Sequence, residues 1–230
     1  AALRVPEEGI VDFAAVVATL RRLIERAGGE VRTSATVRSL TRTPDGWHVE
    51  AGAHALTTAF IVNCAGLHAD RIAALAGAPR DCQIVPFRGE YFVLRPERRE
   101  LVRHLVYPVP DPAFPFLGVH FTRMITGGVE CGPNAVLALA REGYRCTTVH
   151  PRDALEAVAF PGLWRFLARY PRMAWLEVAR SLSKALFTRS LGVDPHHKAS
   201  EFNLANNRTL SRQFTAARAL YTAFIEGSAA

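Results

Sequence analysis

The sequence predicts a mixed α/β (α+β) chain, in which a helix and short strands precede an antiparallel sheet and a helical region. Three observations support this class. Residues 12–27 repeat apolar side chains at helical spacing, residues 30–63 hold short β-prone runs, and residues 84–138 are β-prone, aromatic and interrupted by proline and glycine. A chain of 230 residues with 49% hydrophobic residues can build one large domain or two small ones.

The first predicted helix spans residues 12–27. Its apolar positions recur three and four residues apart and form the stripe of an amphipathic helix: Phe13, Val16, Val17, Leu20, Leu23 and Ile24. Asp12 is suited to cap its N-terminus, and Gly28–Gly29 to end it.

Strands are predicted within residues 30–43, 47–51 and 55–63, with a Pro44–Gly46 turn between the first two. The last run, which includes Phe60–Val62, has the apolar pattern of a buried strand.

Small residues follow this run, from Asn63 to Gly66, and a second helix is predicted over residues 67–75. Because small side chains leave the backbone accessible, a flat or charged ligand could approach it here. A helix, strands and such a loop suggest a nucleotide-binding α/β domain, although any α/β sheet with ordinary connections shows the same pattern.

The second half of the chain has a different residue pattern. Residues 84–138 predict an antiparallel sheet, which would form one wall of a substrate pocket, and the pattern becomes helical beyond Asp153. Residues 192–207 are polar and irregular, and residues 210–225 again predict an amphipathic helix.

The composition argues against several classes of function. The net charge of +7 comes almost wholly from arginine, but no run of five basic residues occurs, so nucleic-acid binding is a remote alternative. The four cysteines lie far apart without a CxxC pair, which favours free thiols over a zinc site. No apolar run approaches the ~18 residues that a membrane-spanning helix needs.

Several sequence blocks together resemble one family. They are GIVDF (9–13), VNCAGLHADRIA (62–73), IVPFRGEYFVL (84–94), YPVPDPAFPFLGVHFTR (107–123), GPNAVLA (132–138), REGY (141–144) and RSLSKALF (180–187). In these blocks the chain resembles the FAD-dependent oxidoreductases of the D-amino-acid-oxidase type. Within them it resembles the L-2-hydroxyglutarate oxidase/dehydrogenase group, over roughly residues 3–191.

The resemblance implies a domain organisation. Residues 1–80 would form part of an FAD-binding Rossmann-like domain, residues 81–191 an antiparallel-sheet substrate domain, and residues 192–230 a divergent tail. The family's GxGxxG phosphate loop and its C-terminal segment have no match, so we expect a fragment of a flavoenzyme that binds FAD poorly by itself.

The resemblance also implies residues that contact FAD: the backbone of Val37, and the loop of Asn63, Cys64, Ala65 and Gly66. From the residues alone, Asn63 is suited to close the turn. Cys64 is expected to pack as a small buried hydrophobic residue rather than to react, because no base flanks it.

Two residues are candidates for the chemistry of 2-hydroxy-acid oxidation, which needs a base for the hydroxyl proton. His120 falls on a predicted strand beside Gly118, which would leave room for a ligand. Tyr107 and His120 resemble a tyrosine–histidine pair that lines the substrate site in relatives. The alternative is a core histidine that bonds a backbone carbonyl.

A dicarboxylate substrate calls for arginine, and Arg88 and Arg123 both fall on predicted strands. For Arg88 an ion pair with Glu90 is an equal alternative. Tyr91 alternates to the opposite face, so it would join them only if the strand bulges. Asn134 would either bind the substrate or cap a turn at Gly132–Val136, and turn capping is the default.

The parent enzyme would therefore oxidise L-2-hydroxyglutarate to 2-oxoglutarate and pass electrons to quinone or oxygen. The resemblance implies a cytoplasmic protein. The aromatic residues within 164–178 are by default core or interface residues, and the alternative that the resemblance implies is a peripheral contact with the inner membrane. The alternatives are a related amine or D-amino-acid oxidase, and a catalytically inactive fragment that serves as an interaction module.

Overall fold

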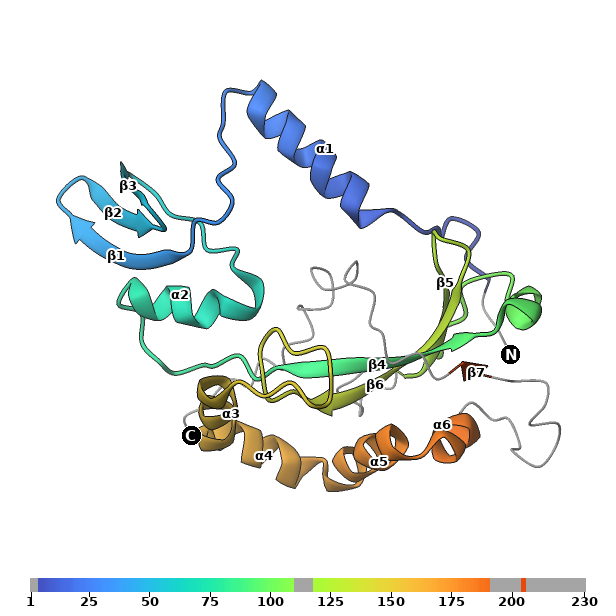
Figure 1. Cartoon of the computed structure of the whole chain (residues 1–230). Coiled ribbons are helices and arrows are strands. Elements are labelled where there is room, and N and C mark those ends of the chain that lie inside the picture. The colour runs from blue at the N-terminus through green and yellow to red at the C-terminus, as the bar shows by residue number, and fades with distance from the viewer. Residues whose placement is uncertain (1–3, 110–117, 191–203, 206–230) are drawn as a thin grey trace. The chain divides into compact units, whose positions relative to one another are not determined.

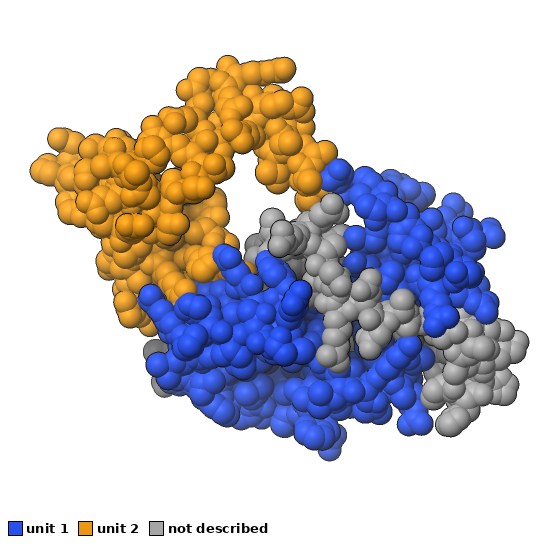
Figure 2. Space-filling model, in the orientation of Figure 1, with its two compact units in different colours: residues 1–12, 87–212 blue, residues 13–86, 213–230 orange. Residues whose placement is uncertain are grey.

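The computed structural model describes residues 4–109, 118–190 and 204–205. The chain divides into two compact units, coloured separately in Figure 2: unit 1 comprises residues 1–12 and 87–212, and unit 2 comprises residues 13–86 and 213–230. The described helices and antiparallel sheets confirm the predicted fold class (Figure 1). The helix predicted over residues 210–225 lies outside the described residues.

Unit 2 begins with helix α1 (Phe13–Arg26), which ends close to its predicted stop. Gly28 adopts a φ of +82°, and the N–H of Gly29 donates to the carbonyl oxygen of Ile24. The apolar stripe of α1 contains no buried residue: its six members are 37–59% exposed. The local sequence pattern is thus sufficient to form the helix, and the apolar stripe of α1 is exposed.

A three-stranded antiparallel meander follows α1 in unit 2. It consists of β1 (Val37–Thr43), β2 (Gly46–Ala51) and β3 (His54–Thr58), in that order. Residues 66–68 then form the short 3-10 helix η1, which leads into α2 (Ala69–Leu75), and α2 contacts β1.

The prediction of a buried strand at Phe60–Val62 is wrong. Strand β3 ends at Thr58, and Phe60 and Val62 are 87% and 84% exposed. An extended segment becomes part of a sheet only when its backbone groups find a neighbouring strand. Within the described part of the chain, no strand pairs with these residues.

Unit 1 is built on a four-stranded antiparallel sheet in the order β5-β6-β4-β7. The strands are β4 (Phe87–Leu94), β5 (His120–Arg123), β6 (Val129–Leu137) and β7 (Leu204–Ala205), which confirms the predicted sheet. The register between β4 and β6 shifts between Glu90 and Phe92, so one extra residue of β6 is accommodated as a bulge.

Four helices follow β6 in the chain: α3 (Pro151–Ala159), α4 (Pro161–Arg169), α5 (Pro171–Leu182) and α6 (Lys184–Ser190). The first three begin with a proline, whose missing N–H and fixed φ suit the first helical position. A further 3-10 helix, η2 (Pro96–Leu101), follows β4.

The core of unit 1 lies between one face of the sheet and the last helices. Phe187 of α6 is fully buried, and its ring centroid lies 4.4 Å from that of Phe92 on β4. Leu94, Val102, Val129 and Cys131 are the other buried residues of this cluster. Because successive side chains of a strand point to opposite faces, the strand residues that alternate with these core residues lie on the opposite face of the sheet.

None of the described helices combines the length and apolarity that crossing a membrane requires.

Candidate functional site

The two candidate catalytic residues lie side by side at the edge of the sheet in unit 1. Val106 and Phe121 form an antiparallel bridge with both backbone hydrogen bonds, which puts Tyr107 directly across from His120. The rings of Tyr107 and His120 are stacked, with centroids 4.5 Å apart. Tyr107 is 47% exposed and His120 only 6%, so the pair joins a buried imidazole to an accessible phenol.

The backbone determines the tautomer of His120. Its Nδ1 lies 3.0 Å from the carbonyl oxygen of Gly118. Since a carbonyl oxygen only accepts, Nδ1 must carry the proton, and the neutral ring then has its lone pair on Nε2. The contact expected of a core histidine is therefore present, and it also orients the ring as a general base would require.

Gly118 does not leave room for a ligand, contrary to the prediction. A Cβ built on Gly118 would lie 2.6 Å from Cγ of Pro108. The absence of a side chain instead lets the segment containing Pro108 approach β5, and this approach brings Tyr107 over His120.

Tyr91 shares the sheet face of His120. The register pairs His120 with Gly132, and a Cβ on Gly132 would lie 2.6 Å from Cδ1 of Tyr91. The ring of Tyr91 also covers Gly89, where a Cβ would meet its Cε2 at 3.0 Å. Tyr91, Tyr107 and His120 thus lie on one face, with the bulge of β6 beneath them.

Arg88 lies on the opposite, helix-covered face of the sheet. Its Nη2 donates to Oε1 of Glu90 at 2.8 Å, and its Nη1 donates to the carbonyl oxygen of Arg145. Glu90 in turn accepts a hydrogen bond from the hydroxyl of Ser181 on α5 at 2.5 Å. The structure therefore contains the ion pair that was the alternative to a substrate contact.

Asn134 also faces the helices and is 1% exposed. Its Nδ2 donates to the backbone carbonyl oxygen of Glu177 at 2.7 Å, and Oε2 of Glu177 accepts from the N–H of Ala135 at 2.7 Å. The predicted turn at Gly132–Val136 is wrong, because these residues continue strand β6 through its bulge.

Like Arg88 and Asn134, Arg123 does not lie on the sheet face of Tyr107 and His120. Its register partner is the core residue Val129, and its Nη1 donates to the carbonyl oxygen of Val102 at 2.7 Å. The six predicted residues of the substrate domain thus divide into two groups. Tyr91, Tyr107 and His120 share one sheet face, while Arg88, Arg123 and Asn134 are bonded on the other.

Sequence reasoning missed Glu177 and Ser181. They lie four residues apart on α5, and both face the sheet. The sequence signal that could have found Glu177 is its spacing: it is an acidic residue four positions after the apolar Met173, so both lie on the buried face of α5. Burial raises the pKa of Glu177, although the Ala135 N–H and Arg180 oppose the shift.

The predicted cofactor loop lies in unit 2. Asn63 closes it on both sides: its Oδ1 accepts from the N–H of Ala65 at 3.2 Å, and its Nδ2 donates to the carbonyl oxygen of Ala69 at 2.8 Å. The expectation that Cys64 is buried is wrong, because the loop carries its thiol on the surface. Ala65 is half-buried and precedes η1.

The loop passes a structural test for a flat cofactor at Gly66. This residue has a φ of +54°, and an added Cβ would meet no atom within 4 Å, so the backbone is open to an approaching ring. Val37, in the same unit, begins β1 and is half-buried. The open backbone at Gly66 is compatible with FAD, and these residues would hold the cofactor through backbone contacts.

Comparisons with known proteins identify the family of the chain. The model of the family described as "FAD dependent oxidoreductase" matches residues 1–197. The chain is 41% identical over 192 residues to L-2-hydroxyglutarate dehydrogenase of Indibacter alkaliphilus, covering 83% of this chain and 48% of that protein.

Two further relatives come from a bacterium and an animal. The Escherichia coli K12 L-2-hydroxyglutarate dehydrogenase is 42% identical over 188 residues (80% of this chain, 44% of that protein). The mitochondrial enzyme of the same name from Caenorhabditis elegans is 42% identical over 186 residues (79% and 43%). The chain spans about half the length of the curated relatives that it matches. With the family model matching most of its length, the chain belongs to the FAD-dependent oxidoreductases.

Proposed function

We propose that this chain is part of an enzyme that oxidises L-2-hydroxyglutarate to 2-oxoglutarate. The stacked Tyr107–His120 pair supports a site for 2-hydroxy-acid oxidation, and the names of the relatives supply the substrate. Residues 1–80 would contribute to the cofactor site through Val37 and Asn63–Gly66, and residues 81–191 to the substrate site.

His120 would act as the base. FAD, when bound, supplies the acceptor for the hydride that leaves the α-carbon. With Nδ1 bonded to Gly118, Nε2 of His120 would accept the proton of the substrate hydroxyl. Tyr107 is 47% exposed, and its hydroxyl would donate to the substrate and orient it.

The contacts of the three helix-side residues favour a supporting role. For Arg88 and Arg123 to hold the two substrate carboxylates, each guanidinium would have to leave its present partner. We propose that both arginines and Asn134 maintain the sheet, and that Tyr91 lines the substrate face. A dicarboxylate contact by Arg88 or Arg123 stays a prediction, which the KM of the corresponding methionine variants would test.

The replacement His120→Asn tests the proposal sharply. An asparagine amide can still donate to the carbonyl oxygen of Gly118 but cannot act as a base near neutral pH. In the FAD-loaded enzyme that contains this chain, we expect kcat to fall by about 10²–10⁴-fold. Tyr107→Phe is the matched control, because it keeps the aromatic stack and should affect KM more than kcat.

Flavin bleaching under anaerobic conditions separates the candidate substrates. Bleaching by L-2-hydroxyglutarate, but not by D-amino acids or secondary amines, supports the proposal. The reverse pattern would favour a D-amino-acid or amine oxidase, and no bleaching at all would favour an inactive interaction module. Undiminished bleaching of the His120→Asn variant would remove His120 from the mechanism.

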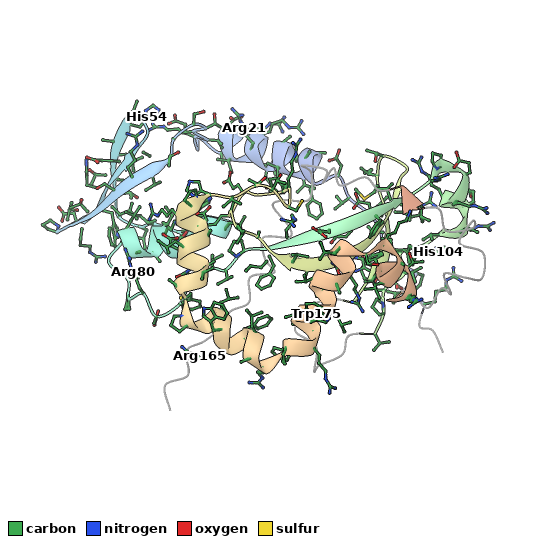
Figure 3. All side chains as sticks on the ribbon, turned by 60° about the horizontal axis from the view of Figure 1, so that its bottom comes forward. Arg21, His54, Arg80, His104, Arg165 and Trp175 are labelled. Atoms are coloured by element: carbon green, nitrogen blue, oxygen red, sulfur yellow. The ribbon has the colours of Figure 1, made fainter. Side chains whose placement is uncertain are left out.

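We also propose a quinone or oxygen as electron acceptor and peripheral contact with an anionic membrane. Residues 161–190 carry six basic residues and one acidic residue, the buried Glu177. Trp175 and Leu182, seven residues apart on the outer side of α5, are 72% and 81% exposed, and Figure 3 labels Trp175 together with Arg165 of α4. Exposed tryptophan among arginines is typical of peripheral membrane surfaces.

Vesicle sedimentation tests the membrane contact. The protein should bind vesicles that contain anionic lipid and not neutral ones, and Trp175→Ser should weaken the binding without changing turnover of a soluble dye. Equal binding to both vesicle types would contradict the proposal. Oxygen uptake measured against quinone reduction would identify the acceptor.

A further inference from the structure

Helix α5 is attached to the sheet at the strand pair that carries the bulge. Glu90 and Asn134 are register partners on β4 and β6. Ser181 bonds Glu90, and Glu177, one helical turn earlier, bonds Asn134. Two neighbouring positions on the helix thus hold two paired positions on the sheet.

Glu177 makes the more unusual of the two attachments, since it bonds two consecutive residues of β6. Its backbone carbonyl oxygen accepts from Nδ2 of Asn134, and its carboxylate accepts from the N–H of Ala135, both at 2.7 Å. Strand β5 pairs with β6 only from Val129 to Gly132, so Ala135 lies beyond the end of that pairing. The Glu177 carboxylate takes the place that a carbonyl oxygen of a longer neighbouring strand would occupy.

The bonded residues directly follow the bulge that supports the candidate site. Gly132 and Pro133 precede Asn134, Gly132 is in register with His120, and the ring of Tyr91 lies over Gly132. A shift of β6 along its own axis would change both the pairing of Gly132 with His120 and its contact with the ring of Tyr91. The position of β6 is therefore set from the opposite side of the sheet.

We propose that Glu177 is a positioning residue for the substrate face, acting through the β6 bulge on Tyr91 and His120. The inference rests on the proposed function of that face, but the effect of Glu177 on the positions of Tyr91 and His120 does not depend on the identity of the substrate. Glu177 lies on the other side of the sheet and does not itself touch the reacting atoms. Its Ala135 hydrogen bond, rather than its bulk, would be the feature that matters.

Three variants of α5 test the proposal in the FAD-loaded enzyme that contains this chain. Glu177→Leu removes the acceptor for Ala135, Glu177→Gln retains one, and Arg180→Met removes only the 3.3 Å contact between Arg180 and Glu177. We expect Glu177→Leu to lower kcat by about 10–100-fold at nearly unchanged KM, because small misplacements are costly in the transition state. Glu177→Gln and Arg180→Met should stay within about threefold of the parent kcat.

A spectroscopic measurement separates failure of this inference from failure of the proposed function. The Ala135 amide should exchange faster with solvent in Glu177→Leu than in Glu177→Gln, and the NMR signals of the His120 ring should shift in the leucine variant alone. These changes without any L-2-hydroxyglutarate oxidation in the parent protein would support the positioning role and refute the substrate. A leucine variant with parental kcat per bound flavin and unshifted His120 signals would overturn the inference.

Discussion

The Arg88–Glu90 pair makes a quantitative prediction about the stability of unit 1. The two side chains are 7% and 26% exposed, and their contact measures 2.8 Å. Arg88→Met would leave the Glu90 carboxylate with the Ser181 hydroxyl. Breaking a buried pair costs about 3–5 kcal/mol, and the partial exposure of Glu90 reduces this to about 2 kcal/mol.

The lost hydrogen bond from Arg88 to the carbonyl oxygen of Arg145 adds about 1 kcal/mol. The free energy of unfolding should therefore fall by about 3 kcal/mol, which corresponds to a decrease in Tm of roughly 6–12 °C. The double variant Arg88→Met/Glu90→Gln carries no uncompensated charge at this position. It should be less destabilised than the sum of the single variants by about 2 kcal/mol.

Urea unfolding of the four proteins, followed by circular dichroism, measures this coupling. Single-variant effects that add within about 0.5 kcal/mol would refute the argument that the pair acts as a unit. An Arg88→Met variant of parental stability with a greatly raised KM for the dicarboxylate would show that Arg88 binds substrate instead.

Three further predictions concern the packing around the same sheet. Burial raises the pKa of Glu177 above 4.5, so its carboxyl holds the proton more tightly when folded. Its contribution to stability is then greatest below pH 4.5 and is lost as pH rises through the folded pKa. Glu177→Gln should flatten this decline in urea midpoints, and parallel profiles would contradict it. Phe187→Ala should lower the free energy of unfolding by about 3–5 kcal/mol, because the ring is fully buried against Phe92, and a loss below about 1 kcal/mol would indicate that the core repacks. Gly132→Ala should displace Tyr91, since the new Cβ would lie 2.6 Å from its ring, and unchanged tyrosine fluorescence together with unchanged stability would argue against that contact.

Local patterns in the sequence were sufficient for most of the elements. The apolar stripe and the Gly28 stop predicted α1, and the helical pattern beyond Asp153 predicted the helices of that region. Alternation along β4 predicted that Tyr91 faces away from Arg88 and Glu90. These features depend on residues close together in the chain, where spacing alone determines which side chains share a face.

Pairing between distant segments required the tertiary structure. Phe60–Val62 have the composition of a buried strand, but no described strand pairs with them, and Phe60 and Val62 are exposed. Residues 132–136 have the composition of a turn, but pairing with β4 holds them in a bulged strand. In both cases the backbone hydrogen-bond partner decides the outcome, and a single segment does not contain its partner.

The candidate site shows the same division. The sequence by itself determined the family and proposed Tyr107 and His120, whose adjacency the bridge between Val106 and Phe121 then produces. The sequence left Arg88 between Glu90 and a substrate carboxylate, and the tertiary structure shows the bond to Glu90. Only the tertiary structure assigned Asn134 to Glu177, because that bond joins the sheet to a helix distant in sequence. Residue types indicate which chemistry a chain can perform, whereas the register of the strands and the helix above them determine which side chains meet.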